Sequence, residues 1–404
     1  MPDKIELFIF YYQPFKAGGP SYTCTEILNY LLNSEISGTV YAPRVNGPTD
    51  YGFKIVSVIP RKPFPYKPVS YAAARLVEGR LMHDVARSKS SQKVVYLWPG
   101  ASIGMVRALS EQGVVLVREL INTFDGYGEP IIAKEYRRCG ETRAGPSREK
   151  LIDGDRIQLS AVDLIFANNK FVEESLRTAQ VPEDRVLPSS YGWSPERLSG
   201  DTRALETSSR PTFLYVGDVS IHKGVHLLLD YWAQAGIEGR LVLAGGVEPA
   251  LRRIRARELS RPDIISLGYV ADIGAVYRSA DVFVFPSLDE GGPQVTYEAA
   301  GCGLPLIVSP MGAGRIAVED VNALIRDPHD AEGWIDALRR IARDLDLRAR
   351  LGQAAAASAQ EFTWAKVGAR RRELLLDALS RKAAWQPSFI RPSNDRSPHP
   401  HSTF

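Results

Sequence analysis

Short runs of apolar residues alternate with helical patterns along most of this chain of 404 residues. The apolar runs are continuous rather than interrupted by alternating polar residues, which is typical of strands buried on both faces of a parallel sheet. Strands that alternate with helices favour an α/β fold with helices on both faces of each sheet. The predicted strands cover residues 4–11, 38–41, 94–97, 114–117, 162–167, 212–216, 240–244, 264–267, 282–285 and 304–308.

One polar stretch, residues 194–211, interrupts this alternation and is followed at once by a new strand. A single sheet of ten or more strands is uncommon, so we predict two doubly wound domains rather than one domain with a long surface loop. The predicted parts are a first domain (1–195), a linker (196–210), a second domain (211–362), a final helix that crosses back to the first domain (363–382) and a disordered tail (383–404).

The composition is that of an ordinary globular protein, with 44% hydrophobic and 24% charged residues. A net charge of +3 gives no argument for a nucleic-acid partner. Three scattered cysteines (Cys24, Cys139 and Cys302) fit a reducing compartment and no disulfide framework. The start of the chain lacks the pattern of a secretion signal, and no apolar run is long enough to span a bilayer. We therefore expect a cytoplasmic protein, with peripheral contact to the inner membrane face as an option.

The histidines do not predict a metal site. His222 and His226 stand four residues apart, but no third ligand lies near them in the sequence, and His83 and His329 are isolated. No group of cysteines and histidines has the spacing of a zinc site. We therefore expect no metal ligands in this chain.

Two glutamates, Glu290 and Glu298, stand eight residues apart in a segment that reads FPSLDEGGPQVTYEAAGCGLP. The predicted strand 282–285 leads into a glycine turn, and Pro293 suits the start of a helix because its missing N–H has no partner there anyway. The N–H groups and the dipole of such a helix start favour an anion. A carboxylate pair around this position suits a nucleotide sugar, whereas the same pair in isolation would be two solvated acids.

Lys223 marks a second such position, in the segment FLYVGDVSIHKG that follows the linker. The predicted strand ends at Gly217, and Lys223 stands where the next helix begins. A lysine adds charge to the positive end of a helix, so an anion nearby is expected to compensate it. We predict that the helix starts at Lys223 and Pro293 converge on one diphosphate, with a solvated lysine as the alternative.

Together these motifs resemble the Glu-x7-Glu signature and neighbouring landmarks of the family-4 retaining glycosyltransferases. That family has the GT-B fold, in which two Rossmann-like domains face each other across a cleft. The resemblance covers nearly the whole chain, strongly over residues 213–327 and thinly before residue 162. It implies a nucleoside-diphosphate sugar as the donor substrate, no separate cofactor, and a glycan or lipid-linked acceptor on the first domain.

The resemblance also implies roles for individual residues. Glu290 would hold the hydroxyls of the transferred sugar, Glu298 the ribose, and Lys223 the diphosphate. A glycine loop after the first strand would face the donor, and residues near 268 would lie close to the base. The donor-binding residues implied in this way are Gly18, Gly19, Gly217, Gly268, Tyr269, Gly291, Gly292, Pro293, Gln294, Val295 and Glu298.

The chain departs from the family pattern at three places. Asp218 stands where family members commonly carry an arginine that contacts the diphosphate. Ser194 ends a Gly-Trp-Ser segment where Gly-Val-Asp is usual. No histidine ends a first-domain strand near the reacting sugar, and Glu119 or Asn122 are the candidates for that position, with a structural role as the alternative. We predict Glu119, Glu290 and Lys223 as the catalytic residues.

Two further patterns have simpler explanations. Asp153 and Asp155 spell the Asp-x-Asp of metal-dependent glycosyltransferases, but their neighbours recur at helical spacing instead of ending a strand. The region from Arg61 to Lys93 holds eight basic and two acidic residues, and its middle has an amphipathic helical pattern. A solvated basic face is the default, and docking on anionic lipid is the alternative.

The leading prediction is therefore a retaining, metal-independent glycosyltransferase that uses a nucleotide sugar. A sugar-nucleotide epimerase or a glycosyl phosphorylase on the same fold is the second possibility. The third is a degenerate transferase that serves as a binding protein. The three departures favour that reading, whereas the presence of Glu290, Glu298 and Lys223 opposes it.

Overall fold

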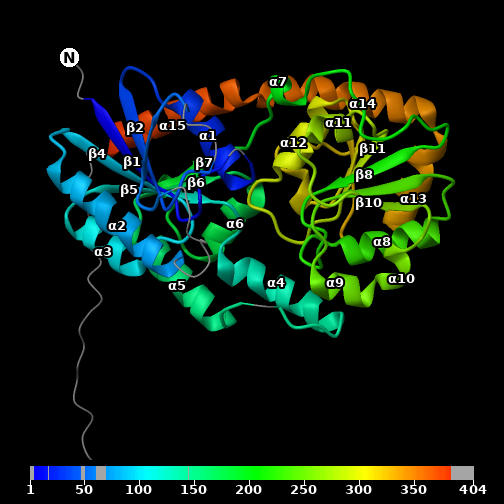
Figure 1. The fold of residues 1–404 in the computed structure, drawn as a ribbon, viewed down its shortest axis with the longest axis horizontal. Helices are drawn as coiled ribbons and strands as arrows, with labels where there is room; N and C mark the ends of the chain where they lie inside the picture. The colour runs from blue at the N-terminus through cyan, green and yellow to red at the C-terminus, as the bar shows by residue number, and fades with distance from the viewer. Residues whose placement is uncertain (1–3, 17, 47–50, 61–69, 144, 384–404) are drawn as a thin grey trace, which may run out of the picture.

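The computed structural model describes residues 4–16, 18–46, 51–60, 70–143 and 145–383. Two lobes lie side by side along the long axis of the molecule (Figure 1). The first lobe holds a seven-stranded sheet in the order β3-β2-β1-β4-β5-β6-β7, and the second a six-stranded sheet in the order β10-β9-β8-β11-β12-β13. Neighbouring strands pair in parallel throughout both sheets. The predicted α/β fold with two parallel, helix-covered sheets is confirmed.

All ten predicted strands are present, and three short ones were missed. The first sheet contains β1 (Ile5–Phe10), β2 (Ile36–Ala42), β3 (Lys54–Ser57), β4 (Gln92–Leu97), β5 (Val115–Leu120), β6 (Leu164–Ala167) and β7 (Val186–Pro188). The second contains β8 (Thr212–Val216), β9 (Arg240–Ala244), β10 (Ile264–Ser266), β11 (Val282–Phe285), β12 (Leu306–Val308) and β13 (Ala323–Ile325). The missed strands β3, β7 and β13 are edge strands of three or four residues, and β3 and β7 each carry an exposed end residue.

Helices connect the strands and cover the sheets. Those of the first lobe and the linker are α1 (Pro20–Leu31), α2 (Ser70–Arg87), α3 (Ile103–Glu111), α4 (Asp125–Arg138), α5 (Arg148–Ala161), α6 (Lys170–Thr178) and α7 (Pro195–Leu198). The later ones are α8 (Val225–Ala235), α9 (Pro249–Ile254), α10 (Ala256–Leu259), α11 (Ile273–Tyr277), α12 (Gln294–Gly301), α13 (Ala331–Arg343), α14 (Leu345–Ala359) and α15 (Trp364–Ala383). The predicted linker therefore contains one short helix, α7.

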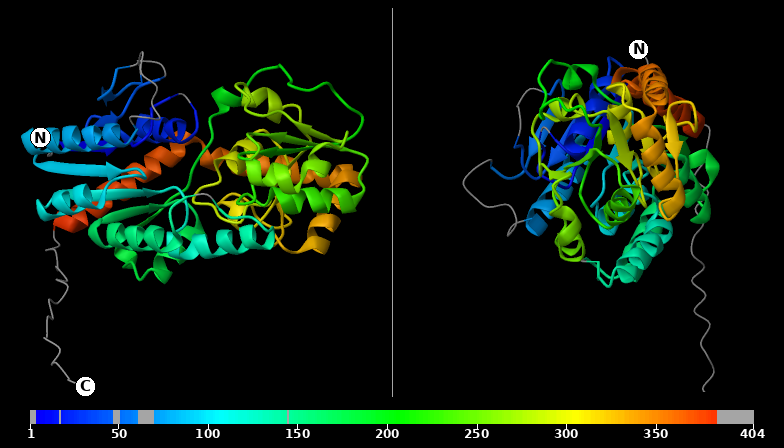
Figure 2. Two further views of the ribbon diagram at one scale, coloured as in Figure 1. Left: turned by 60° about the horizontal axis from the view of Figure 1, so that its bottom comes forward. Right: turned by 90° about the vertical axis from the view of Figure 1, so that its right-hand side faces the viewer.

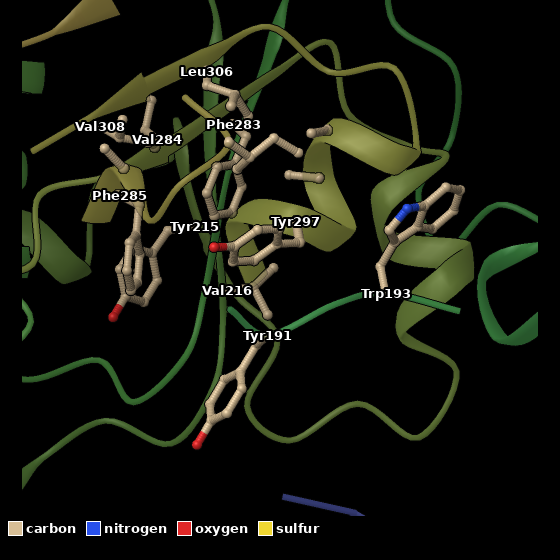
Figure 3. Packing of buried hydrophobic residues seen from close by; sticks show 14 of the residues in the cluster. Tyr191, Trp193, Tyr215, Val216, Phe283, Val284, Phe285, Tyr297, Leu306 and Val308 are labelled. Carbon is tan, nitrogen blue, oxygen red and sulfur yellow. The ribbon is translucent and has the colours of Figure 1, made fainter. Parts of the chain in front are cut away.

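The core of each lobe is the central part of its sheet. Every residue of β8, β11 and β12 is buried, because these strands are apolar on both faces and lie between helices. Figure 3 shows how Phe283 and Phe285 of β11 lie near Tyr215 of β8 and Tyr297 of α12 in this core. The aromatic pairs in this cluster include Tyr215 with Phe285, whose ring centres are 5.6 Å apart.

The last helix, α15, returns to the first lobe and packs along α1 (Figures 1 and 2). A Cβ atom at Gly368 would lie 2.4 Å from Cβ of Tyr30, so glycine is needed where the two helices touch. Arg371 of α15 forms an ion pair with Glu119 of β5, and both side chains are fully buried. This pair anchors the end of the chain in the first lobe.

The structure describes only part of the basic region predicted between Arg61 and Lys93. Residues 61–69 lie outside the described residues, as do residues 384–404 of the predicted tail. The rest forms α2, which buries one apolar stripe against the sheet and leaves Leu76 56% exposed. Within the described part of the chain, no helix combines the length and apolar character that crossing a bilayer requires.

Candidate functional site

The candidate site lies where the strand order of each sheet reverses. In the second sheet β8 is flanked by β9 and β11, and in the first β1 is flanked by β2 and β4. At such a switch point the following loops leave in opposite directions and open a crevice at the carboxyl ends of the strands. Lys223 follows β8 and Glu290 follows β11, while Gly18 and Gly19 follow β1. The predicted donor-site residues therefore stand at the carboxyl-terminal edges of the two sheets, next to the switch points.

Lys223 and Glu290 meet directly across this switch point. The Lys223 ammonium lies 2.6 Å from Oε1 of Glu290 and 3.2 Å from the carbonyl oxygen of Asp289. Ser287 donates a second hydrogen bond of 2.9 Å to the same Glu290 oxygen. The side chains are 17% and 9% exposed, respectively. The anion that Lys223 was expected to need is therefore Glu290 itself.

Glu298 is held by three donors from three separate segments. Its Oε1 accepts from Arg197 at 2.5 Å and from Gln294 at 2.7 Å, and its Oε2 accepts from the Tyr277 hydroxyl at 3.0 Å. Thr23 of α1 donates to Gln294 at 2.7 Å, which links this group to the first lobe. A carboxylate offers about four lone-pair sites, so one acceptor position of Glu298 remains for a ligand hydroxyl.

The glycine turn at Gly291 and Gly292 packs against the first lobe. A Cβ atom at Gly291 would lie 2.2 Å from the carbonyl carbon of Ile121 and 2.4 Å from the amide nitrogen of Asn122. At Gly292 it would lie 2.5 Å from the ring of Tyr191. The sequence interpretation assigned these glycines to close approach of a ligand. In the structure the close approach is that of the other lobe.

Asp289 extends this contact between the lobes. Thr123 donates a hydrogen bond of 2.6 Å to Asp289, and Nε2 of His222 lies 3.7 Å from its other carboxylate oxygen. Burial raises the pKa of Asp289, but His222, Thr123 and Lys223 outweigh it and hold the pKa below its usual value. Asp289 therefore stays ionised in the interface. Sequence reasoning missed it, although it directly precedes Glu290.

The other predicted donor residues lie in loops that follow strands of the two sheets. Tyr269 is 85% exposed, and its hydroxyl would lie 3.5 Å from a Cβ atom at Gly18, so the two loops face each other. Gly19 has a φ of +62° and directly precedes α1. Gly217 has a φ of +136°, and its carbonyl oxygen would lie 1.8 Å from a Cβ atom at Gly245. The strand ends beside Gly217 thus approach too closely for side chains.

At the start of α12, Pro293 occupies the N-cap position, one residue before the first turn in which it was expected. The amide of Gln294 donates to the Gly292 carbonyl oxygen at 2.8 Å. That N–H group is therefore already paired within the turn. Val295, the next predicted residue, lies in the first turn of α12.

Comparison with known proteins finds a family that resembles part of this chain. The family profile of glycosyl transferases group 1 matches residues 210–344. Residues 210–344, about a third of the chain, are therefore similar to this family. They include the whole second sheet, Lys223, Glu290 and Glu298.

Curated proteins with similar sequences are named as glycosyltransferases. The D-inositol 3-phosphate glycosyltransferase of Xylanimonas cellulosilytica is 32% identical over 270 residues, which are 64% of this chain and 62% of that protein. The enzyme of the same name from Saccharomonospora viridis is 40% identical over 253 residues, covering 57% of this chain and 58% of that one. The chain thus spans about three fifths of the length of these curated relatives.

Solved structures show the fold of the whole chain. Sucrose-phosphate synthase from Thermosynechococcus elongatus matches with a TM-score of 0.70 and 17% identity, over 94% of this chain and 100% of that one. HepE from Anabaena, in complex with UDP-glucose, matches with a TM-score of 0.67 and 16% identity, over 92% and 99%. Both likenesses concern the fold, which is GT-B as expected.

The group 1 domain contains one of the three departures from the family pattern. Asp218 is exposed in the turn after β8, where its backbone oxygen accepts a hydrogen bond from Tyr215. The Gly-Trp-Ser segment lies just before this domain. Ser194 caps α7, and Trp193 donates to the Ala359 carbonyl oxygen at 2.8 Å. Trp193 also packs on Gly301 of α12, the helix that carries Tyr297 (Figure 3).

The third departure, the position of the first-domain histidine, requires a correction. Glu119 is fully buried, and it binds Arg371, the Tyr96 hydroxyl and the Asn168 amide. These contacts make Glu119 a structural anion that holds α15, so we no longer count it as catalytic. Asn122 is exposed and its backbone adjoins Gly291, so it is the better placed of the two candidates.

The Asp-x-Asp pair lies in α5, as its helical spacing predicted. Asp155 forms an ion pair with Arg118 and accepts a hydrogen bond of 2.9 Å from the amide of Asp125. This carboxylate therefore serves to join β5, α4 and α5. It does not lie at the end of a strand beside the crevice.

Proposed function

We propose that this chain is a retaining glycosyltransferase that transfers a sugar from a nucleoside-diphosphate sugar to a glycan or lipid-linked acceptor. The observation that carries this proposal is the pairing of Lys223 and Glu290, 67 residues apart, at the switch point of the group 1 domain. The names of the relatives and the GT-B fold of the whole chain support it.

The chemical barrier in such a transfer is the departure of the diphosphate from the anomeric carbon. Negative charge grows on the leaving oxygen, so a fixed cation beside it lowers the barrier. Lys223 supplies that cation in our proposal, without a divalent metal at the diphosphate. When the diphosphate engages the ammonium, Glu290 keeps its hydrogen bond from Ser287 and turns its carboxylate to the hydroxyls of the transferred sugar.

In this proposal, separate loops bind the remaining parts of the donor. Glu298 would accept a ribose hydroxyl with its remaining acceptor position, beside Arg197 and Gln294. Tyr269, at 85% exposure, offers an aromatic face on which a base can stack. The loop at Gly18 and Gly19 would close over the sugar and the acceptor from the first lobe.

The test begins with a thermal-shift screen of nucleotide sugars, because a ligand that binds the folded state raises its apparent stability. Products formed from the donor identified in this way are then followed by mass spectrometry. A sugar nucleotide altered without an acceptor would indicate an epimerase, and a sugar 1-phosphate formed from a glycan and inorganic phosphate would indicate a phosphorylase. Donor binding without turnover on any acceptor would indicate a binding protein.

Site variants then test the assigned roles. Lys223→Ala and Glu290→Ala should each lower turnover about a hundredfold or more, since one lost electrostatic contact of this kind costs about 2.7–4 kcal/mol. Lys366→Ala is the matched control, because Lys366 forms an exposed pair with Glu361 at 2.7 Å. Turnover like that of the wild type in a folded Lys223→Ala protein would refute the role of that lysine.

We further propose peripheral membrane contact through α2, which would suit a lipid-linked acceptor. Leu76 is 56% exposed, and the side chains of Arg75 and Arg80 on the same helix are 61% and 52% exposed. Such a helix can insert an apolar side chain among anionic headgroups. Co-sedimentation with anionic vesicles, lost in Leu76→Ser and absent with zwitterionic vesicles, is the expected result.

A further inference from the structure

A carboxylate, a thiol and an imidazole meet where α4 of the first lobe adjoins α8 of the second. Glu135 lies in the last turn of α4, Cys139 directly follows that helix, and His226 lies in the first turn of α8. One potential ligand atom from each residue lies within 4.8 Å of the other two. The proposed donor site uses none of the three, so the cluster needs its own explanation.

The cluster is buried and drawn from both lobes. Glu135 and His226 are 3% and 2% exposed, and Nε2 of His226 lies 2.7 Å from Oε1 of Glu135. A second imidazole approaches from the turn before α13, where Nε2 of His329 lies 3.5 Å from Oε2 of Glu135. Arg138, whose side chain is 60% exposed, caps the open side with a contact of 2.9 Å to Nδ1 of His329.

An ion pair between Glu135 and His226 accounts for only part of this arrangement. Among the described residues, Nδ1 of His226 is buried and has no hydrogen-bond partner. Cys139 is a free thiol, and an ion pair gives no reason for a thiol beside it. Thiolate, imidazole and carboxylate are, however, the three donor types that Zn²⁺ takes in proteins.

The distances are close to those of a zinc site. Zinc bonds of about 2.0–2.3 Å in a tetrahedron place ligand atoms roughly 3.3–3.8 Å apart. The three potential ligand atoms lie within 4.8 Å of one another, and Nε2 of His226 lies only 2.7 Å from Oε1 of Glu135, so this pair has to move apart and shifts of up to about 1 Å would bring the ligand atoms into that range. His329 lies outside this group of three, with its Nε2 3.5 Å from Oε2 of Glu135, so its ring would have to turn inward and lose its contact with Arg138 to supply a fourth ligand.

We propose that Glu135, Cys139 and His226 bind a zinc-type divalent cation that joins the two lobes, with His329 as the fourth ligand. Binding converts the Cys139 thiol to a thiolate: the S–H bond breaks, the proton passes to solvent, and the sulfur bonds to the metal. One thiolate and one carboxylate neutralise the charge of the cation. The role is structural, because the metal would tie α4 to the helix that follows Lys223.

Cobalt binding to the full-length protein tests this proposal without any activity assay. Chelator-treated protein titrated with Co²⁺ should develop a thiolate-to-cobalt charge-transfer band and the visible bands of tetrahedral Co²⁺, and Zn²⁺ should abolish both. Cys139→Ser should lose the charge-transfer band and bind Zn²⁺ at least about tenfold more weakly, since even outer-shell changes cost about 10–100-fold. His226→Gln should weaken binding to a similar degree.

Cys302→Ser is the matched control, because it removes a partly buried thiol elsewhere and should leave the spectrum unchanged. Circular dichroism of each variant without metal shows whether it is folded, so a loss of binding can be separated from a loss of structure. A wild-type protein without a charge-transfer band would overturn the proposal. A folded Cys139→Ser protein with the wild-type band and affinity would overturn it as well.

Discussion

An alanine at position 291 would place its methyl group inside the backbone of the opposite lobe. The Cβ atom would lie 2.2 Å from the carbonyl carbon of Ile121, 2.3 Å from its oxygen and 2.4 Å from the amide nitrogen of Asn122. Ordinary van der Waals contact begins at 3.4 Å, so the Cβ atom would be 1.2 Å too close to the carbonyl carbon of Ile121. Because the obstacles are backbone atoms, a side-chain rotation cannot relieve the overlap. The lobes must separate at this point.

The magnitude follows from the energetics of overpacking. An extra methyl group in a well-packed site costs about 1–3 kcal/mol. If this cost falls on the contact between the lobes, the equilibrium constant for their closure falls about 5–150-fold. We expect kcat/KM to fall by a similar factor, because Lys223 and Glu290 act on a donor that the first lobe must cover.

Two measurements check this expectation. Small-angle X-ray scattering of Gly291→Ala should show a larger radius of gyration, and steady-state kinetics should show the loss in kcat/KM. Gly79→Ala is the matched control, since Gly79 is exposed on α2 with no atom within 4 Å of a Cβ, and alanine there should stabilise the helix by about 0.5–1 kcal/mol. Unchanged scattering and kinetics in Gly291→Ala would refute the reasoning.

Two further variants test buried charges. Arg371→Met leaves Glu119 unpaired in the core, so the free energy of unfolding measured with urea should fall by about 3–5 kcal/mol. Adding Glu119→Gln should recover part of that loss, and additive losses would contradict the pairing. Burial, and then the charge of Asp155, raise the pKa of Asp125 from 3.8 to about 7. Between these pH values the unfolded chain loses the proton that the folded chain keeps, so stability falls as pH rises through this window. Asp125→Asn should therefore be stabilised relative to the wild type at pH 8 and much less at pH 5, and an equal difference in urea denaturation at both pH values would contradict this pKa.

The central strands were predictable because the residues within each strand form a continuous apolar run. β11 is apolar at every position and β8 at every position after Thr212, and that pattern indicates a sheet covered on both faces. The edge strand β3 carries exposed residues at both ends and gives no such signal. The candidate site was predictable for the same reason, since Lys223 and Glu290 each follow a recognisable strand.

Partners that come from distant segments were not predictable. Arg371 lies 252 residues from Glu119, and Arg197 lies 101 residues from Glu298. Nothing in the segment around either arginine indicates which carboxylate it binds. The buried ion pair of Glu119 could not be predicted because its partner comes from the last helix of the chain.

The sequence by itself determined ten of the thirteen strands of the described residues and their alternation with helices, and it placed candidate ligand groups such as Glu290 in loops at strand ends. These features depend on residues a few positions apart, and the pattern of apolar and polar residues over such a short range can be read directly from the sequence. Only the tertiary structure decided that Gly291 touches Ile121 and that Cys139 lies beside His226. Such contacts depend on how two separately packed lobes meet, and that geometry results from many remote surfaces at once.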